Sequence, residues 1–184
     1  MHALPGIEGV SLRPLASHPD ERGELTEVLR LAWLGEAPPP RQWNYVRSGA
    51  NVLRGVHVHV THWDFLVVLE GEAWIGLVDL RRGSKTCGNA RIVRMSGDAK
   101  ALLTVCPGVA HGFYFPRGGV FTYGLSHYWD PENDEFGCRW DDPALGLAWG
   151  LERAPLLSPR DESAGSLAEM LTALEGKAGW CGSG

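Results

Sequence analysis

Hydrophobic and polar residues alternate with a period of two through the middle of the chain. In residues 51–60, one face of the predicted strand carries four valines with Arg54, and the opposite face carries Leu53, His57 and His59. Shorter strand-like segments follow at residues 65–69, 73–80, 91–95, 101–105, 112–115 and 120–129. A long series of short strands predicts an all-β sandwich or barrel.

The end of the chain has the period of a helix. Ser166 and Glu169 form a possible capping box, and apolar side chains then recur at Leu167, Met170, Leu171 and Leu174. We therefore expect one short C-terminal helix, followed by a loose tail over about residues 177–184. Residues 25–34 fit a strand or a helix equally well on pattern alone.

Length, charge and cysteine content narrow the class of protein. The 184 residues suit one domain spanning residues 1–184, and 17 Lys+Arg against 22 Asp+Glu give a net charge of −5. Without a basic run we expect no nucleic-acid partner. No apolar stretch approaches the roughly 18 residues of a membrane span, so we expect no membrane partner. The four cysteines lack CxxC spacing, so we expect no disulfide scaffold. The expected location is therefore the reducing cytoplasm.

Three histidines fall within six residues, at positions 57, 59 and 62. They are either ordinary strand residues or part of a site, since ionisable rings facing a barrel interior need partners. His57, His59, Asp64 and His111 are spaced in a way similar to the two cupin motifs. Three imidazoles and a carboxylate suit Fe, Mn, Zn or Ni, so a metal site is one interpretation.

A second set of motifs covers more of the chain. Seven blocks occur in order, at residues 20–27 (DERGELTE), 53–57 (LRGVH), 79–88 (DLRRGSKTCG), 107–113 (PGVAHGF), 123–128 (YGLSHY), 140–149 (WDDPALGLAW) and 157–161 (LSPRD). Together they resemble the dTDP-4-dehydrorhamnose 3,5-epimerase family from about residue 7 to residue 162. The resemblance implies a cupin-type jelly-roll barrel with a short C-terminal helix. It also implies a homodimer in which the N-terminal strand is shared between the two subunits. For residues 25–34, which the pattern alone left open, it implies that the segment begins in a strand.

The same resemblance implies an isomerase that acts on a nucleotide-diphosphate sugar without a cofactor or a metal. The family inverts carbons next to a C4 ketone, which needs a base and an acid on opposite faces of the sugar. His57 matches the base, Asp161 matches the carboxylate that orients the base, and Tyr123 matches the acid. Positions matched to sugar, diphosphate or nucleotide contacts are Arg22, Glu27, Asn44, Arg54, His59, His111 and Tyr128.

One departure from the family pattern leaves alternatives open. The lysine thought to stabilise the enolate is absent, and Asp64 stands near its place. An ionised carboxylate there would repel an enolate, so His59 or His111 would have to supply positive charge, or a metal ion would. The chain is then an epimerase of altered scope, a metal-binding cupin or 3,4-ketoisomerase-like enzyme, or a non-catalytic sugar-binding protein. A base paired with an acid favours the first interpretation.

Overall fold

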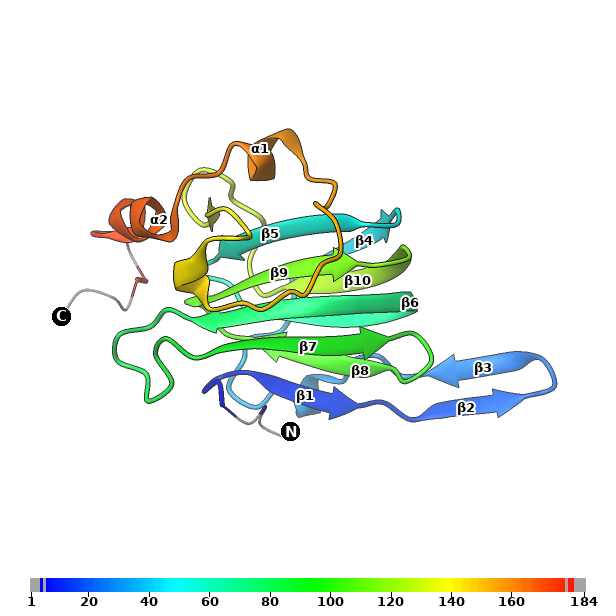
Figure 1. Cartoon of the computed structure of the whole chain (residues 1–184). Helices are drawn as coiled ribbons and strands as arrows, with labels where there is room; N and C mark the ends of the chain where they lie inside the picture. Colours follow the sequence, from blue (N-terminus) through cyan, green and yellow to red (C-terminus); the bar gives the residue numbers. More distant parts are fainter. Residues whose placement is uncertain (1–3, 5, 178, 181–184) are drawn as a thin grey trace.

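The computed structural model describes residues 4, 6–177 and 179–180, and β-strands dominate it (Figure 1). The strands are β1 (Ser11–Pro14), β2 (Ser17–Asp20), β3 (Gly23–Thr26), β4 (Gln42–Ser48), β5 (Val52–Val58), β6 (Asp64–Asp79), β7 (Ala90–Ser96), β8 (Ala101–Val105), β9 (Val109–Phe115), β10 (Gly119–Leu125) and β11 (Phe136–Gly137). The helices are α1 (Pro159–Glu162) and α2 (Leu167–Leu174), with short 3-10 helices at Leu31–Trp33 and Pro143–Leu145. The predicted predominance of β-structure is confirmed.

Strand β6 joins the two sheets of the barrel. Its first half pairs with β8 and β10, and its second half pairs with β7 and β9. The sequence predicted two strands separated at Gly71, but the chain continues through that glycine as one strand of 16 residues. A side chain at Gly71 would meet the Gly118 carbonyl oxygen at 2.5 Å, so this glycine permits close strand packing.

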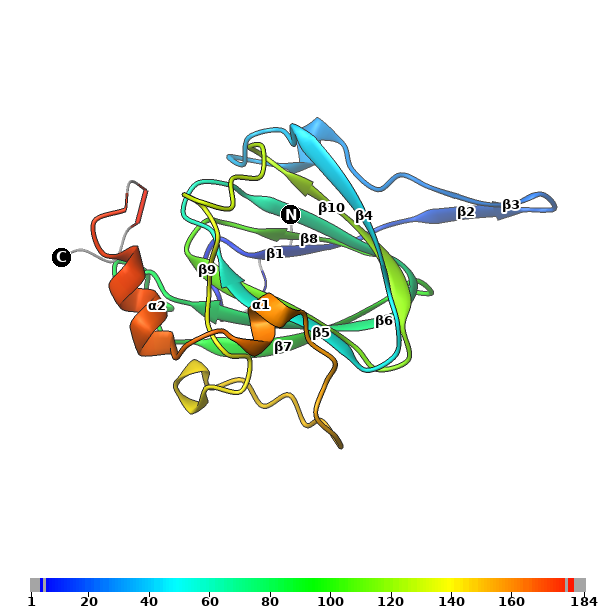
Figure 2. The ribbon, with the colours of Figure 1, turned by 90° about the horizontal axis from the view of Figure 1, so that it is seen from above.

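The two sheets curve around a common interior (Figure 2). One sheet contains β1, β8, β10 and β4, and the other contains β7, β9, β5 and β11, each with half of β6. Apolar side chains such as Leu66, Ile75, Phe115 and Phe121 fill part of this interior. Two further apolar clusters cover the outer faces: α2 and the segment before it pack on one sheet, and residues 28–37 pack on the other.

Strand β5 contains a β-bulge. Its side chains therefore do not alternate regularly between the two faces, although the period-two pattern predicted that they would. The register with β9 shifts between Arg54 and His57, where Gly55 has a positive φ of 112°. Leu53 and Val56 therefore both lie in the outer cluster, and Arg54 and His57 both line the interior. The sequence placed Arg54 on the opposite face from His57, and the bulge corrects this prediction. The valines of β5 are also covered rather than exposed, because α2 packs over them.

The capping box predicts the start of α2 correctly. The Ser166 side chain accepts a hydrogen bond from the Glu169 backbone N–H, and the Glu169 carboxylate accepts one from the Ser166 N–H. Leu167, Met170 and Leu174 are buried against the outer cluster. Of the predicted loose tail, residues 178 and 181–184 lie outside the described residues, and Trp180 is partly buried against the same cluster.

Strands β2 and β3 form a hairpin that extends away from the barrel (Figures 1 and 2). Residues 25–34 begin in β3, as the family resemblance implied, and continue into the first 3-10 helix. Leu25, which pairs with His18 on the hairpin, is 64% exposed. Among the described residues, no helix has the length and apolar character needed to cross a membrane.

Candidate active site

Two adjoining cavities open into the barrel interior. The outer cavity, of about 310 Å³, is lined by residues that include Arg54, His57, Tyr123, Arg160 and Asp161. The inner cavity, of about 70 Å³, is lined by His57, His59, His62, Asp64, His111, Phe113, Tyr123, Leu125, Trp129 and Glu135. His57 and Tyr123 belong to both linings, so they stand where the two cavities meet.

The structure places His57 and Asp161 in direct contact, as expected. His57 Nε2 lies 2.7 Å from Asp161 Oδ1. Asp161 is held by local structure: Ser158 caps the short helix α1 and accepts a hydrogen bond from the Asp161 N–H, and Pro159 occupies the first turn. Burial raises the pKa of the Asp161 carboxyl, but the hydrogen bond and charge of His57, together with hydrogen bonds from Ser158 and the Gly55 N–H, outweigh burial and lower this pKa below its usual value.

Arg160 and Glu135 complete the surroundings of His57, and the sequence did not identify either. Arg160 Nη2 lies 2.7 Å from His57 Nε2 and 3.1 Å from His57 Nδ1, and Arg160 Nη1 lies 2.5 Å from Glu135 Oε1. We assign the imidazole proton to Nε2, because the Asp161 carboxylate beside it can only accept a hydrogen bond. His57 Nδ1 therefore carries the lone pair that a base requires, and Arg160 covers it.

Tyr123 and Arg54 reach the same outer cavity from different strands. Burial, together with the nearby carboxylates of Asp64 and Glu135, raises the pKa of the Tyr123 phenol, which keeps it protonated at neutral pH. Asn44 on β4 is the register partner of Tyr123, and its Nδ2 is a buried donor without a hydrogen-bond partner. A buried amide of this kind is suited to a ligand acceptor.

The inner cavity holds three histidines around Asp64. His62 Nε2 lies 3.7 Å and His111 Nε2 lies 3.8 Å from Asp64 Oδ2, and the rings of His59 and His62 stack with centroids 4.0 Å apart. Burial lowers the pKa of His59 well below its usual value and that of His111 to about 3. Burial raises the pKa of Asp64 to about 7.

His62 differs from its two neighbours. Burial lowers the pKa of its imidazole, but the hydrogen bond from His62 Nδ1 to Asp134 and the charge of Asp64 outweigh burial and raise it. The sequence named His59 or His111 as the source of positive charge; burial lowers the pKa of both, and of the three histidines only His62 has a raised pKa. The physical reason is that Asp134 accepts its hydrogen bond through a carboxylate, whereas His59 and His111 meet only backbone carbonyl oxygens.

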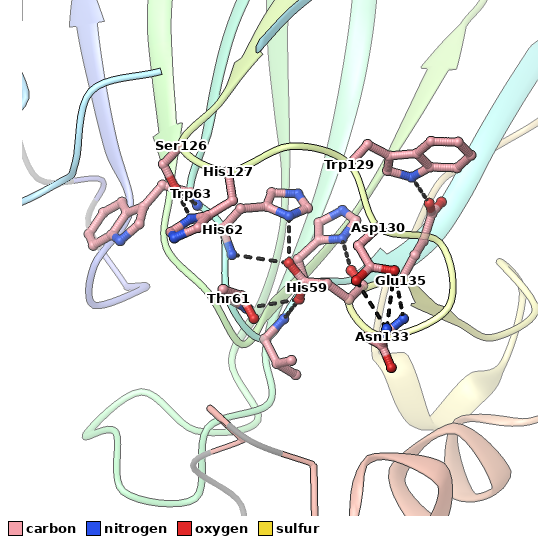
Figure 3. Close-up of polar contacts among 12 residues, drawn as sticks. His59, Thr61, His62, Trp63, Ser126, His127, Trp129, Asp130, Asn133 and Glu135 are labelled. Atoms are coloured by element: carbon pink, nitrogen blue, oxygen red, sulfur yellow. Dashed lines mark hydrogen bonds and ion pairs between the residues drawn. The ribbon is translucent and has the colours of Figure 1, made fainter. Parts of the chain in front are cut away.

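Asp134 anchors the turn that carries His59, Thr61 and His62, which are labelled in Figure 3. Its carboxylate accepts backbone hydrogen bonds from Val60 at 2.6 Å and Thr61 at 2.8 Å, in addition to the His62 side chain at 2.7 Å. Asp130 begins the loop, and its Oδ1 accepts from two backbone N–H groups further along it. The sequence Asp130-Pro131-Glu132-Asn133-Asp134 is a strong turn signal that could have pointed to this loop.

Four expected contact residues are absent from the linings of both cavities: Arg22, Glu27, Asn44 and Tyr128. Arg22 pairs with Asp20 on the β2–β3 hairpin, and Glu27 pairs with Arg30 just after it. The hairpin extends away from the barrel, and Glu27 lies at its base, beside residues that pack on the barrel. Tyr128 is 70% exposed, and its neighbour Trp129 lines the cavities instead, because the Trp129 indole N–H donates to Glu135 (Figure 3).

Comparison with known proteins identifies the family. A family model for dTDP-4-dehydrorhamnose 3,5-epimerase matches residues 5–169. The Neisseria gonorrhoeae protein of that name is 34% identical over 165 residues, which are 86% of this chain and 49% of that protein. This chain therefore spans about half the length of that relative.

Solved structures agree with this result. The Legionella pneumophila epimerase in complex with dTDP-4-keto-L-rhamnose has a TM-score of 0.86 and 32% identity, over 94% of this chain and 95% of that chain. A 3'-monoepimerase from Streptomyces bikiniensis in complex with dTDP-quinovose has a TM-score of 0.84 and 31% identity, over 95% of this chain and 90% of that chain. The expected cupin-type jelly roll is confirmed. The chain belongs to the dTDP-4-dehydrorhamnose 3,5-epimerase family, a family of isomerases.

Proposed function

We propose that this protein epimerises a dTDP-4-keto-6-deoxy sugar at C3, at C5 or at both, in deoxysugar biosynthesis. The observation that carries the proposal is the His57–Asp161 hydrogen bond at a cavity that Tyr123 also lines. A non-catalytic binding protein has no need for a base with a fixed tautomer beside a protonated phenol. The solved relatives with dTDP-sugar ligands support the substrate class.

In the proposed mechanism His57 removes a proton from the carbon next to the ketone. Asp161 accepts the hydrogen bond from Nε2–H and stabilises the imidazolium that forms, so Nδ1 takes the proton. The electron pair of the broken C–H bond moves to the ketone oxygen and gives an enolate. Tyr123 then donates its proton to the opposite face of that carbon, which inverts it. Solvent restores both side chains.

Cations at the mouth of the outer cavity suit the diphosphate. Arg54 and Arg160 line this cavity, and guanidinium groups bind phosphate oxygens in a bidentate manner. Arg160 also covers His57 Nδ1 in the structure. Moving Arg160 onto the diphosphate would uncover the base when substrate binds, and the unpartnered Nδ2 of Asn44 would gain an acceptor.

We further propose that two copies of the chain form a homodimer through the β2–β3 hairpin. Arg22 lies on this hairpin, away from its own barrel, and Glu27 lies at its base, so in this dimer both would meet the cavity of the second copy. The exposed Leu25 gives the hairpin an apolar contact for such an interface.

Solvent exchange tests the proposed function. We would incubate the protein with a panel of dTDP-4-keto-6-deoxy sugars in deuterium oxide and follow C3 and C5 by NMR. We expect deuterium at one or both carbons and no exchange in a buffer control. Binding without exchange would identify a sugar-binding protein, and movement of the ketone to C3 would identify a ketoisomerase. Either result would contradict the proposal.

A further inference from the structure

The inner cavity contains three imidazoles whose hydrogen bonds fix the same tautomer. His59 Nδ1 lies 2.7 Å from the Asp134 carbonyl oxygen, His62 Nδ1 lies 2.7 Å from Asp134 Oδ2, and His111 Nδ1 lies 3.2 Å from the Val109 carbonyl oxygen. Each Nδ1 therefore carries a proton, and each neutral ring has its lone pair on Nε2. Histidine ligands of metal ions are oriented by hydrogen bonds of this kind.

One of the two ring nitrogens of His62 has no hydrogen-bond partner among the described residues. Its Nε2 is buried and has no hydrogen-bond partner, although the residue is only 1% exposed. The nearest carboxylate oxygen, Asp64 Oδ2, lies 3.7 Å away, which is too far for a hydrogen bond. A buried nitrogen lone pair that faces a buried carboxylate at this distance leaves space for a cation between the two.

The spacing of the cluster fits one ion. Ligand atoms of His59, His62 and Asp64 all lie within 4.8 Å of one another, and all three residues are buried. Two ligands on one tetrahedral ion, each about 2.1 Å from it, lie about 3.4 Å apart. Small side-chain rotations would bring the three groups to that distance. His111 Nε2, 3.8 Å from Asp64 Oδ2, is in reach as a fourth ligand.

We propose that His59, His62 and Asp64, with His111 beside them, bind one divalent transition-metal ion in the inner cavity. Imidazole nitrogens with a single carboxylate select ions such as Zn²⁺, Fe²⁺, Ni²⁺ and Co²⁺ over Mg²⁺ or Ca²⁺, which prefer oxygen ligands. A cavity of about 70 Å³ also has room for water on the ion. His57 is not among these ligands, because Asp161 holds it at the outer cavity.

The position of the ion suggests its use. The inner and outer cavities share His57 and Tyr123, so an ion held here lies next to the groups proposed to move protons. It would supply positive charge beside the enolate in a chain that lacks the lysine of its family. This use rests on the proposed function, but binding of the ion does not.

Metal binding is measured directly, without an activity assay. The protein is stripped with EDTA, dialysed and titrated with Co²⁺ and Zn²⁺, while metal content is determined by mass spectrometry and the visible Co²⁺ spectrum is recorded. We expect one ion per chain, a Co²⁺ spectrum with nitrogen ligation, and a melting temperature raised by Zn²⁺. Asp64→Asn and His62→Gln should weaken binding by more than the 10–100-fold that loss of an outer-sphere partner costs, and Asp134→Asn by about 10–100-fold.

Two controls separate this site from other histidines. His18→Gln changes an exposed histidine on β2, and His57→Asn changes the histidine outside the cluster; both should bind Co²⁺ like the wild type. Asp64→Asn is isosteric, so it carries the test if His62→Gln does not fold. Circular dichroism of the stripped proteins reports on folding.

The results that would contradict the metal site differ from the results that would contradict the proposed function. An ion bound by a protein that exchanges no sugar proton supports the metal site and contradicts the proposed epimerase. Wild-type protein without a stoichiometric ion, or binding that Asp64→Asn and His62→Gln leave unchanged, would overturn the metal site. Exchange of the sugar proton by a protein that binds no ion would also overturn the metal site. Protonated His62 would then supply the positive charge beside the enolate.

Discussion

At the scale of single residues, the contacts of His57 set its chemistry. Asp161 accepts the hydrogen bond that assigns the proton to Nε2, and the Arg160 guanidinium lies against both ring nitrogens. Glu135 holds Arg160 from the other side at 2.5 Å. The imidazole is thus oriented before substrate arrives, which is how an enzyme avoids the entropic cost of arranging its base during the reaction.

Removing the Asp161 carboxylate tests this orientation. We expect Asp161→Asn to fold, because Ser158 still caps helix α1, but to slow solvent exchange of the sugar proton by about 10²–10⁴-fold. An asparagine can hold the wrong tautomer and cannot balance the imidazolium charge. The exchange rate is measured by NMR on substrate in deuterium oxide. A rate within a factor of two of wild type would show that Asp161 only supports the fold.

Asp79 provides a pH-dependent contribution to stability away from the site. Burial raises the pKa of its carboxyl, but hydrogen bonds from Arg81, Ser84 and Thr86 outweigh burial and lower it to about 2. Because the folded pKa is depressed, the stabilisation is present above the unfolded value near pH 4. It is lost as the pH falls toward 2.

We therefore expect Asp79→Asn to lower the unfolding free energy by about 2 kcal/mol at pH 7. The difference between variant and wild type should shrink between pH 4 and pH 2, the range set by the shift of this pKa. Denaturant unfolding at a series of pH values measures it. A constant difference across that range would show that the Asp79 charge does not contribute.

At the scale of elements, the sequence predicted β5 to β10 from their recurring apolar residues, and it did not predict β1, β2, β4 or β11. A period-two pattern does not predict which way side chains point where the hydrogen-bonded pairing of strands is irregular. The bulge at Gly55 reverses the phase of β5 and brings Arg54 to the same cavity as His57, which no periodic pattern can show. The proposed metal site includes His62, which does not belong to a strand. Its place in the cavity depends on the turn that Asp134 holds by hydrogen bonds.

The bulge depends on Gly55. A Cβ at this position would lie 2.8 Å from Gly112 Cα and 2.9 Å from the His111 carbonyl oxygen, and φ is 112°. We expect Gly55→Ala to lose at least about 2 kcal/mol of stability. Gly83→Ala is the matched control, because nothing lies within 4 Å of its added Cβ. Equal melting temperatures for the two variants would disprove the requirement for glycine.

At the scale of the whole molecule, the hairpin separates part of the expected site from the rest. Arg22 is 84% exposed in its side chain and lies at a hairpin that projects from the barrel, whereas His57 lies inside the barrel. The sequence matched both residues to one site, and in the proposed homodimer they would reach it from different copies of the chain.

Mixing two inactive variants tests the shared site. Arg22→Ala and His57→Asn should each have little activity, and each should form a dimer by light scattering. If Arg22 serves the cavity of the second copy, a heterodimer contains one intact site. Random subunit exchange would then restore about a quarter of the wild-type sites. If both residues serve the same cavity in the same chain, mixing restores nothing, and the shared hairpin is disproved.

The central claim is that His57 removes a proton from the carbon beside the ketone, and one measurement tests it most directly. Wild type and His57→Asn are compared for deuterium incorporation into the same dTDP-4-keto-6-deoxy sugar, with binding of that sugar measured on both. We expect similar binding by the two proteins and exchange that is at least about 10²-fold slower in the variant. Undiminished exchange in His57→Asn would contradict it.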